Sequence, residues 1–184
     1  NTNILIGDSQ LMIIEADEYD RSFLSLNPFM GLVSSVDKDH VDTYSTYEDM
    51  LFAYNTFVKK CKNIIIHEGI RNKLQSPRIT NTLFYSFSNE ITLGYSLKNN
   101  HNISHNNFSV MKNNELLFSL EFPNIPKYNI ENFLAAISIA VELNVTYDNI
   151  IESIRSFKGV NRRFEYHVKN DNFILIEDYA HHPV

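Results

Sequence analysis

The chain has 184 residues, with 16 Lys and Arg against 22 Asp and Glu, so its formal net charge is -6 and its pI is about 5.6. This acidic balance, with basic residues scattered along the chain, argues against a nucleic-acid groove or an anionic membrane surface as the partner. The length suits one domain with a buried core, and no apolar stretch is long enough to cross a bilayer.

Targeting features are absent from the start of the chain as given. Acidic Asp8, Glu15 and Asp17 lie there, with no basic region ahead of an apolar block, so no signal peptide is predicted. Cys61 has no second cysteine to pair with, which suits a reducing compartment. We therefore expect a cytoplasmic location.

Two apolar runs near the start each lead into a cluster of polar residues. Residues 11–14 predict a buried strand that ends at Glu15, and residues 32–36 predict a second strand that leads to His40. Open α/β sheets bind ligands at the carboxyl ends of their strands, so Glu15 and His40 are candidate ligand-binding residues. The alternative is that the acidic residues only favour the positive end of a following helix.

The middle of the chain alternates helix and strand patterns. Residues 45–48 form a capping-box pattern, and the apolar spacing after it predicts a helix to about Lys60, followed by a strand at 64–66. Asn113 and Asn114 suit a hairpin turn. Four β-type segments predict a small, mostly antiparallel patch attached to the parallel sheet: residues 83–87, 91–95, 108–111 and 116–120.

The last third predicts two helices and a strand. One apolar stripe runs through residues 130–141, and a second helix is capped by Thr146 and closed by Gly159. Residues 173–176 predict a strand that ends just before Asp178. The expected fold class is α/β: a mostly parallel sheet flanked by helices, with a small antiparallel β patch.

Two asparagines, Asn129 and Asn132, lie three apart at the start of the first of these helices. A side-chain amide offers both donors and an acceptor, as reading the edge of an adenine requires. The alternative, which spacing alone favours, is that Asn129 caps the helix. Further on, Arg162 and Arg163 follow a glycine turn, where two guanidiniums could clamp phosphate oxygens.

The remaining histidines give weaker signals. His181 and His182 are adjacent, but no nearby Cys or third His completes a zinc spacing. Four further histidines lie outside the motifs and are expected to be solvated or structural: His67, His101, His105 and His167.

The order of these segments resembles the Mur ligases. Residues 15–24 with 39–44 resemble the metal-binding centre of that family, residues 128–136 its adenine-binding Asn-x-x-Asn-x-x-Ala-Ala segment, and residues 157–164 its Gly-x-x-Arg-Arg-Phe segment. The resemblance implies the central-domain fold of this family, with ATP and Mg²⁺ or Mn²⁺ as cofactors. It also implies roles for six residues: Glu15 and His40 as catalytic metal ligands, Asn129 and Asn132 on the adenine, Arg163 on the phosphates, and Asp178 on the ribose.

Within the family, the resemblance favours the branch that adds L-alanine to UDP-N-acetylmuramate in peptidoglycan synthesis. Asn55 stands where several other branches carry a carbamylated Lys, which agrees with that branch, whereas Tyr128 replaces its usual His. The alternatives are the recycling ligase that attaches a tripeptide to the same nucleotide sugar and a non-catalytic nucleotide-binding module. A hydrolase has no second motif to support it.

None of the five glycines belongs to a Gly-x-x-x-x-Gly-Lys-Ser/Thr phosphate loop. We therefore expect residues 1–184 to be a central-domain fragment without the phosphate loop and the C-terminal domain. Such a fragment is expected to be inactive alone.

Overall fold

A computed structural model describes residues 4–38, 42–74, 81–87, 91–100, 106–122, 127–163 and 165–179. Its centre is a six-stranded sheet in the strand order β1-β2-β3-β4-β5-β6. The strands are β1 (Met30–Val33), β2 (Asn63–His67), β3 (Thr82–Ser86), β4 (Gly94–Asn99), β5 (Asn107–Lys112) and β6 (Glu115–Glu121). Strands β1 to β4 pair in parallel, and β4 to β6 pair antiparallel. The predicted α/β class, with an antiparallel patch on a parallel sheet, is confirmed. The patch is smaller than predicted, because its first predicted segment, 83–87, became β3, which pairs in parallel with both β2 and β4.

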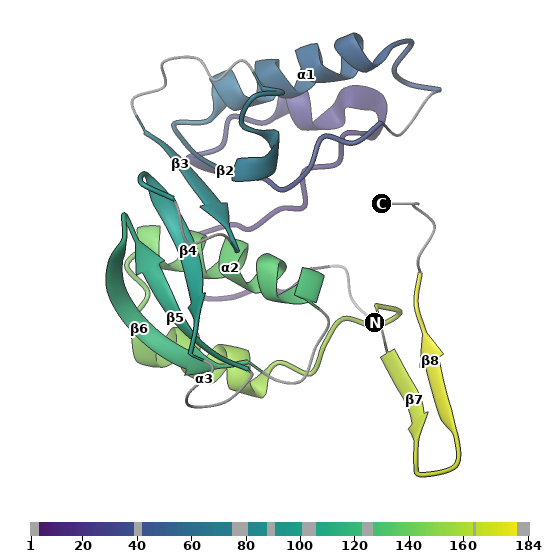
Figure 1. Cartoon of the computed structure of the whole chain (residues 1–184). Helices are drawn as coiled ribbons and strands as arrows, with labels where there is room; N and C mark the ends of the chain where they lie inside the picture. Colours follow the sequence, from purple (N-terminus) through teal and green to yellow (C-terminus); the bar gives the residue numbers. More distant parts are fainter. Residues whose placement is uncertain are drawn as a thin grey trace.

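Helices cover both faces of this sheet (Figure 1). α1 (Tyr47–Lys60) and the short 3₁₀ helix η1 (Tyr19–Ser25) lie on one face, and α2 (Lys127–Glu142) and α3 (Tyr147–Ser156) on the other. Alternate side chains of a strand point to opposite faces, and β2 shows the result. Ile64 and Ile66 pack in the α1 core while Ile65 packs in the α2 core, and all three are essentially fully buried.

The helix ends follow the capping chemistry of the sequence. The Thr46 hydroxyl accepts a hydrogen bond from the backbone N–H of Asp49 (3.1 Å), so α1 is capped at Thr46, one residue later than the predicted capping box implied. Thr146 caps α3 as predicted. However, α3 ends at Ser156, so Gly159 follows the helix and does not close it.

The hairpin between β5 and β6 turns at the predicted residues. Asn113 and Asn114 both have positive φ angles, 52° and 68°, which a two-residue type I′ turn requires. The Asn113 side chain also accepts a hydrogen bond from the N–H of Gly94 (2.9 Å). Gly94 has φ +139°, and a Cβ there would lie 1.9 Å from the carbonyl oxygen of Phe84, so only glycine fits.

The predicted strand at residues 11–14 is wrong. This segment has no regular structure, and its side chains are exposed, with Ile13 at 92%. A strand exists only where a neighbour satisfies its backbone hydrogen bonds, and none of the described residues pairs with this segment. The second predicted strand, 32–36, is displaced to Met30–Val33, although Val36 is still buried.

The last two strands form a separate hairpin. β7 (Glu165–Lys169) and β8 (Ile174–Glu177) pair antiparallel and lie apart from the six-stranded sheet (Figure 1). β8 matches the predicted strand at 173–176, but it is exposed along its whole length, and β7 was not predicted. Among the described residues, no helix is long and apolar enough to cross a membrane.

Candidate functional site

The two halves of the predicted metal centre are joined by one hydrogen bond. The Tyr44 hydroxyl donates to the backbone carbonyl oxygen of Glu18 over 2.7 Å. Tyr44 is 3% exposed, and burial raises the pKa of its hydroxyl while the nearby Arg21 charge acts in the opposite direction. The hydroxyl is therefore a neutral donor that ties the segment after Glu15 to the segment after His40.

Arg21 makes a second connection between the same segments. Its guanidinium forms an ion pair with Asp49 at the start of α1 (2.5 Å) and lies over the Tyr44 ring, 5.1 Å from its centre. Asp20 and Arg21 both adopt the left-handed backbone region, with φ of 55° and 57°. Such a conformation costs about 1–2 kcal/mol for a residue other than glycine, so the Arg21 contacts hold a strained turn in place.

Glu15 lies three residues before Glu18 in the irregular segment and is exposed. Its carboxylate makes no hydrogen bond or ion pair with any part of the chain that the structure describes. His40, with Asp39 and Val41, lies outside the described residues, so the predicted Glu15–His40 pairing stays a prediction. What the structure adds is that their flanking residues, Glu18 and Tyr44, are in direct contact.

Both predicted adenine-binding residues lie in the first two turns of α2. Asn129 is half-buried and Asn132 is exposed. The helix begins at Lys127, so Asn129 lies within its first turn and does not occupy the N-cap position. The alternative prediction, that Asn129 caps this helix, is therefore wrong. The adenine role of both residues stays a prediction.

The segments of Arg163 and Asp178 are brought side by side. The backbone N–H of Tyr179 donates to the carbonyl oxygen of Arg162 over 2.7 Å, next to both predicted residues. Arg163 and Asp178 are both exposed. The predicted phosphate and ribose contacts thus belong to one local surface, although they are fifteen residues apart in the sequence.

Of the two settings expected for His67, solvated or structural, the structure shows the structural one, with partners that the sequence did not identify. It ends β2, its Nδ1 accepts a hydrogen bond from the N–H of Gly69 (3.2 Å), and its Nε2 lies 3.8 Å from the Glu131 carboxylate on α2. Its ring packs edge-on against Tyr85, whose pKa is raised chiefly by burial and further by the Glu131 charge. Its position at a strand end was the one signal available in the sequence.

The chain matches a family model described as the Mur ligase middle domain, over residues 4–140. The UDP-N-acetylmuramate–L-alanine ligase of Clostridium acetobutylicum is 38% identical over 192 aligned residues, and that of Clostridium botulinum is 37% identical. Both alignments cover 100% of this chain and 41% of the relative. The chain therefore spans about two fifths of the length of these relatives.

Solved structures with the same fold include MurC, the UDP-N-acetylmuramate–alanine ligase of Thermotoga maritima. It has a TM-score of 0.71 and 20% identity, and the match covers 91% of this chain and 38% of that one. MurF from Acinetobacter baumannii follows with a TM-score of 0.63 and 12% identity, covering 86% of this chain and 36% of that one. At such low identities these likenesses concern the fold alone.

Proposed function

The chain belongs to the Mur ligase family through its middle domain, and on that premise we propose that it is the nucleotide-binding middle domain of a ligase that joins L-alanine to UDP-N-acetylmuramate. One observation carries this proposal: relatives that align with the whole chain at 37–38% identity bear the name of that activity. ATP is the expected energy source, as in the family at large. The product belongs to peptidoglycan synthesis.

Glu15 and His40 are the proposed metal-binding residues. When bound, a divalent ion neutralises charge on the phosphoryl group that ATP transfers to the substrate carboxylate. Carboxylate oxygens suit Mg²⁺, and the exposed Glu15 carboxylate is not engaged by any described residue, so it fits this role. An imidazole suits Mn²⁺ or a second, substrate-side ion better than Mg²⁺.

Asn129, Asn132, Arg163 and Asp178 are the proposed nucleotide contacts. The amides at the start of α2 would hold the adenine edge, while the Arg163 guanidinium binds phosphate oxygens and the Asp178 carboxylate accepts from the ribose hydroxyls. The hydrogen bond between Tyr179 and Arg162 supports joint action of the last two, because it keeps their segments adjacent.

The test is a coupled ADP-release assay on the full-length enzyme with magnesium-ATP and UDP-N-acetylmuramate. We expect ADP formation that depends on L-alanine and does not occur with the murein tripeptide. Turnover with the tripeptide alone would assign the chain to the recycling ligase. Nucleotide binding without turnover on either substrate would favour a non-catalytic module.

A further inference from the structure

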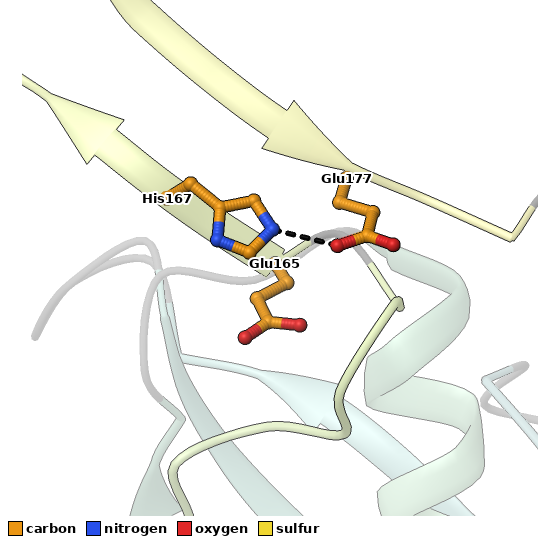
Figure 2. Close-up of side chains that lie close together, drawn as sticks. All are labelled: Glu165, His167 and Glu177. Carbon is orange, nitrogen blue, oxygen red and sulfur yellow. Dashed lines mark hydrogen bonds and ion pairs between the residues drawn. The ribbon is translucent and has the colours of Figure 1, made fainter.

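Three side chains with metal-binding atoms converge on the hairpin of β7 and β8. Glu165 and His167 come from β7 and Glu177 from β8, and Figure 2 shows the His167 ring facing the Glu177 carboxylate, with the Glu165 side chain beside them. One ligand atom from each residue lies within 4.8 Å of the other two. His167 Nε2 and the Glu177 carboxylate are already 2.7 Å apart.

The strand register explains this convergence. Glu165 and Glu177 are direct cross-strand partners, so their side chains start from neighbouring positions on one face. The register shifts between Tyr166 and Val168, so His167 is the extra residue of a β-bulge. A bulge redirects a side chain, and here the imidazole comes to lie beside the Glu pair.

The pairing of Glu165 with Glu177 is electrostatically unfavourable without a cation, because like charges directly opposite each other destabilise a hairpin. Arg162 offsets part of this charge: its Nε lies 3.5 Å from Glu177, and its backbone N–H donates to Glu165 over 2.7 Å. However, the Arg162 side chain is 70% exposed and can move away. A divalent ion would neutralise both carboxylates at once.

The donor set indicates which ion fits. One imidazole with two carboxylates suits a first-row transition metal such as Zn²⁺ better than Mg²⁺, which prefers an all-oxygen shell. Ligand atoms around tetrahedral Zn²⁺ are about 3.4 Å apart, given bonds of about 2.1 Å. The His167–Glu177 pair is already closer than this, and the third ligand atom, on the half-buried Glu165, lies within 4.8 Å of both, so a small side-chain movement would complete the site.

We propose that Glu165, His167 and Glu177 bind a divalent first-row transition metal ion of the Zn²⁺ class, with water completing the coordination shell. This site is distinct from the proposed Glu15–His40 centre and does not depend on it. An ion here links β7 to β8 directly beside Asp178, so metal binding orders the hairpin that carries this predicted ribose contact.

The test is a titration of the 184-residue chain with ZnCl₂, followed by calorimetry and by NMR of the histidine ring nitrogens. The NMR readout needs no variant, and it identifies which imidazole takes the ion. We expect micromolar binding with a shift of the His167 Nε2 signal. Binding that shifts only the His40, His181 or His182 signals would overturn the proposal, as would the absence of binding up to millimolar Zn²⁺.

Variants give a second, independent readout. His167→Ala and Glu177→Gln should each weaken Zn²⁺ binding about tenfold or more, because each removes a ligand. Glu115→Gln, at an exposed Glu on β6, is the matched control and should leave the affinity unchanged. The same Zn²⁺ affinity in all three variants would show that the ion binds elsewhere and would contradict the proposal. All these positions are at least partly exposed, and circular dichroism will verify that each variant is folded.

Discussion

The hydroxyl of the buried Tyr44 donates a hydrogen bond to the backbone carbonyl oxygen of Glu18, twenty-six residues earlier in the chain. Glu18 follows the proposed metal ligand Glu15, and Tyr44 follows the proposed ligand His40. The bond therefore holds two loops together at the point where both are expected to meet the metal. We propose that Tyr44 is a positioning residue, because within the described part of the chain its neutral hydroxyl bonds to a backbone carbonyl and not to a proposed ligand.

Tyr44→Phe should lower the free energy of unfolding by about 1 kcal/mol, because it removes one of two hydrogen bonds to the Glu18 carbonyl oxygen, which still accepts from the Arg21 N–H. In the full-length ligase, the same change should raise the concentration of Mg²⁺ needed for half-maximal rate. Urea denaturation and a magnesium titration of the rate measure the two effects. Tyr47→Phe is the control, because the Tyr47 hydroxyl bonds to none of the described residues. A Tyr44→Phe enzyme with an unchanged magnesium requirement would contradict the positioning role.

Glu15→Ala in the full-length ligase should lower kcat about a hundredfold or more, since the carboxylate is assigned to the metal that stabilises the transferred phosphoryl group. Folding should hardly change, with a loss under about 0.5 kcal/mol, because Glu15 is exposed. Steady-state kinetics and thermal unfolding measure these effects separately. Asp8→Ala, at another exposed acidic residue nearby, serves as the control. A near-normal rate in Glu15→Ala would remove the metal-binding assignment.

Asn132→Ala should weaken ATP binding to the full-length ligase by about 1–3 kcal/mol, the cost of an unpaired polar group on the base. Inorganic triphosphate, which lacks the base, should bind as it does to the unaltered enzyme. Competition titrations with both ligands distinguish adenine recognition from a general effect on the helix. Equal weakening of the two ligands would show that Asn132 acts through the structure of α2.

Cys61 should react slowly with thiol reagents in the folded chain. The side chain is 4% exposed, and burial raises the pKa of its thiol from 9.0 to about 11, so little thiolate exists near pH 8. Because the folded pKa is raised, this group's contribution to stability is fully present below about pH 9 and is lost as the pH rises toward 11. Labelling with a chromogenic disulfide at pH 8, with and without urea, measures how slowly Cys61 reacts in the folded chain. Fast labelling without urea would mean that Cys61 is accessible.

The loss of stability at alkaline pH that is predicted for Cys61 can be measured with a variant. Between pH 8 and pH 10.5, Cys61→Ala should show a shallower fall in the free energy of unfolding than the unaltered chain. The buried Tyr44, Tyr85 and Tyr95, whose pKa values burial also raises, should contribute to the slope that remains. Identical slopes in the two proteins would contradict the raised pKa of Cys61.

The sequence predicted helices, turns and caps correctly where one short segment contains all the residues that determine them. The helices that became α1, α2 and α3 were predicted from apolar spacing, and the Asn113-Asn114 turn from its need for two positive φ angles. The Thr146 cap follows the same rule, since a hydroxyl and a backbone N–H three residues apart are enough to form it. The family resemblance likewise depended on the order of motifs along the chain.

Tertiary structure decided everything that depends on a partner distant in sequence. Residues 11–14 have the composition of a buried strand, but a strand needs a neighbouring strand, and the described residues supply none. Likewise, β7 was not predicted, so the convergence of Glu165, His167 and Glu177 could not be foreseen. It depends on a cross-strand register and a bulge, which no short stretch of sequence specifies. Composition and spacing thus determined which residues are available for chemistry, whereas strand pairing and side-chain contacts decided which of them meet.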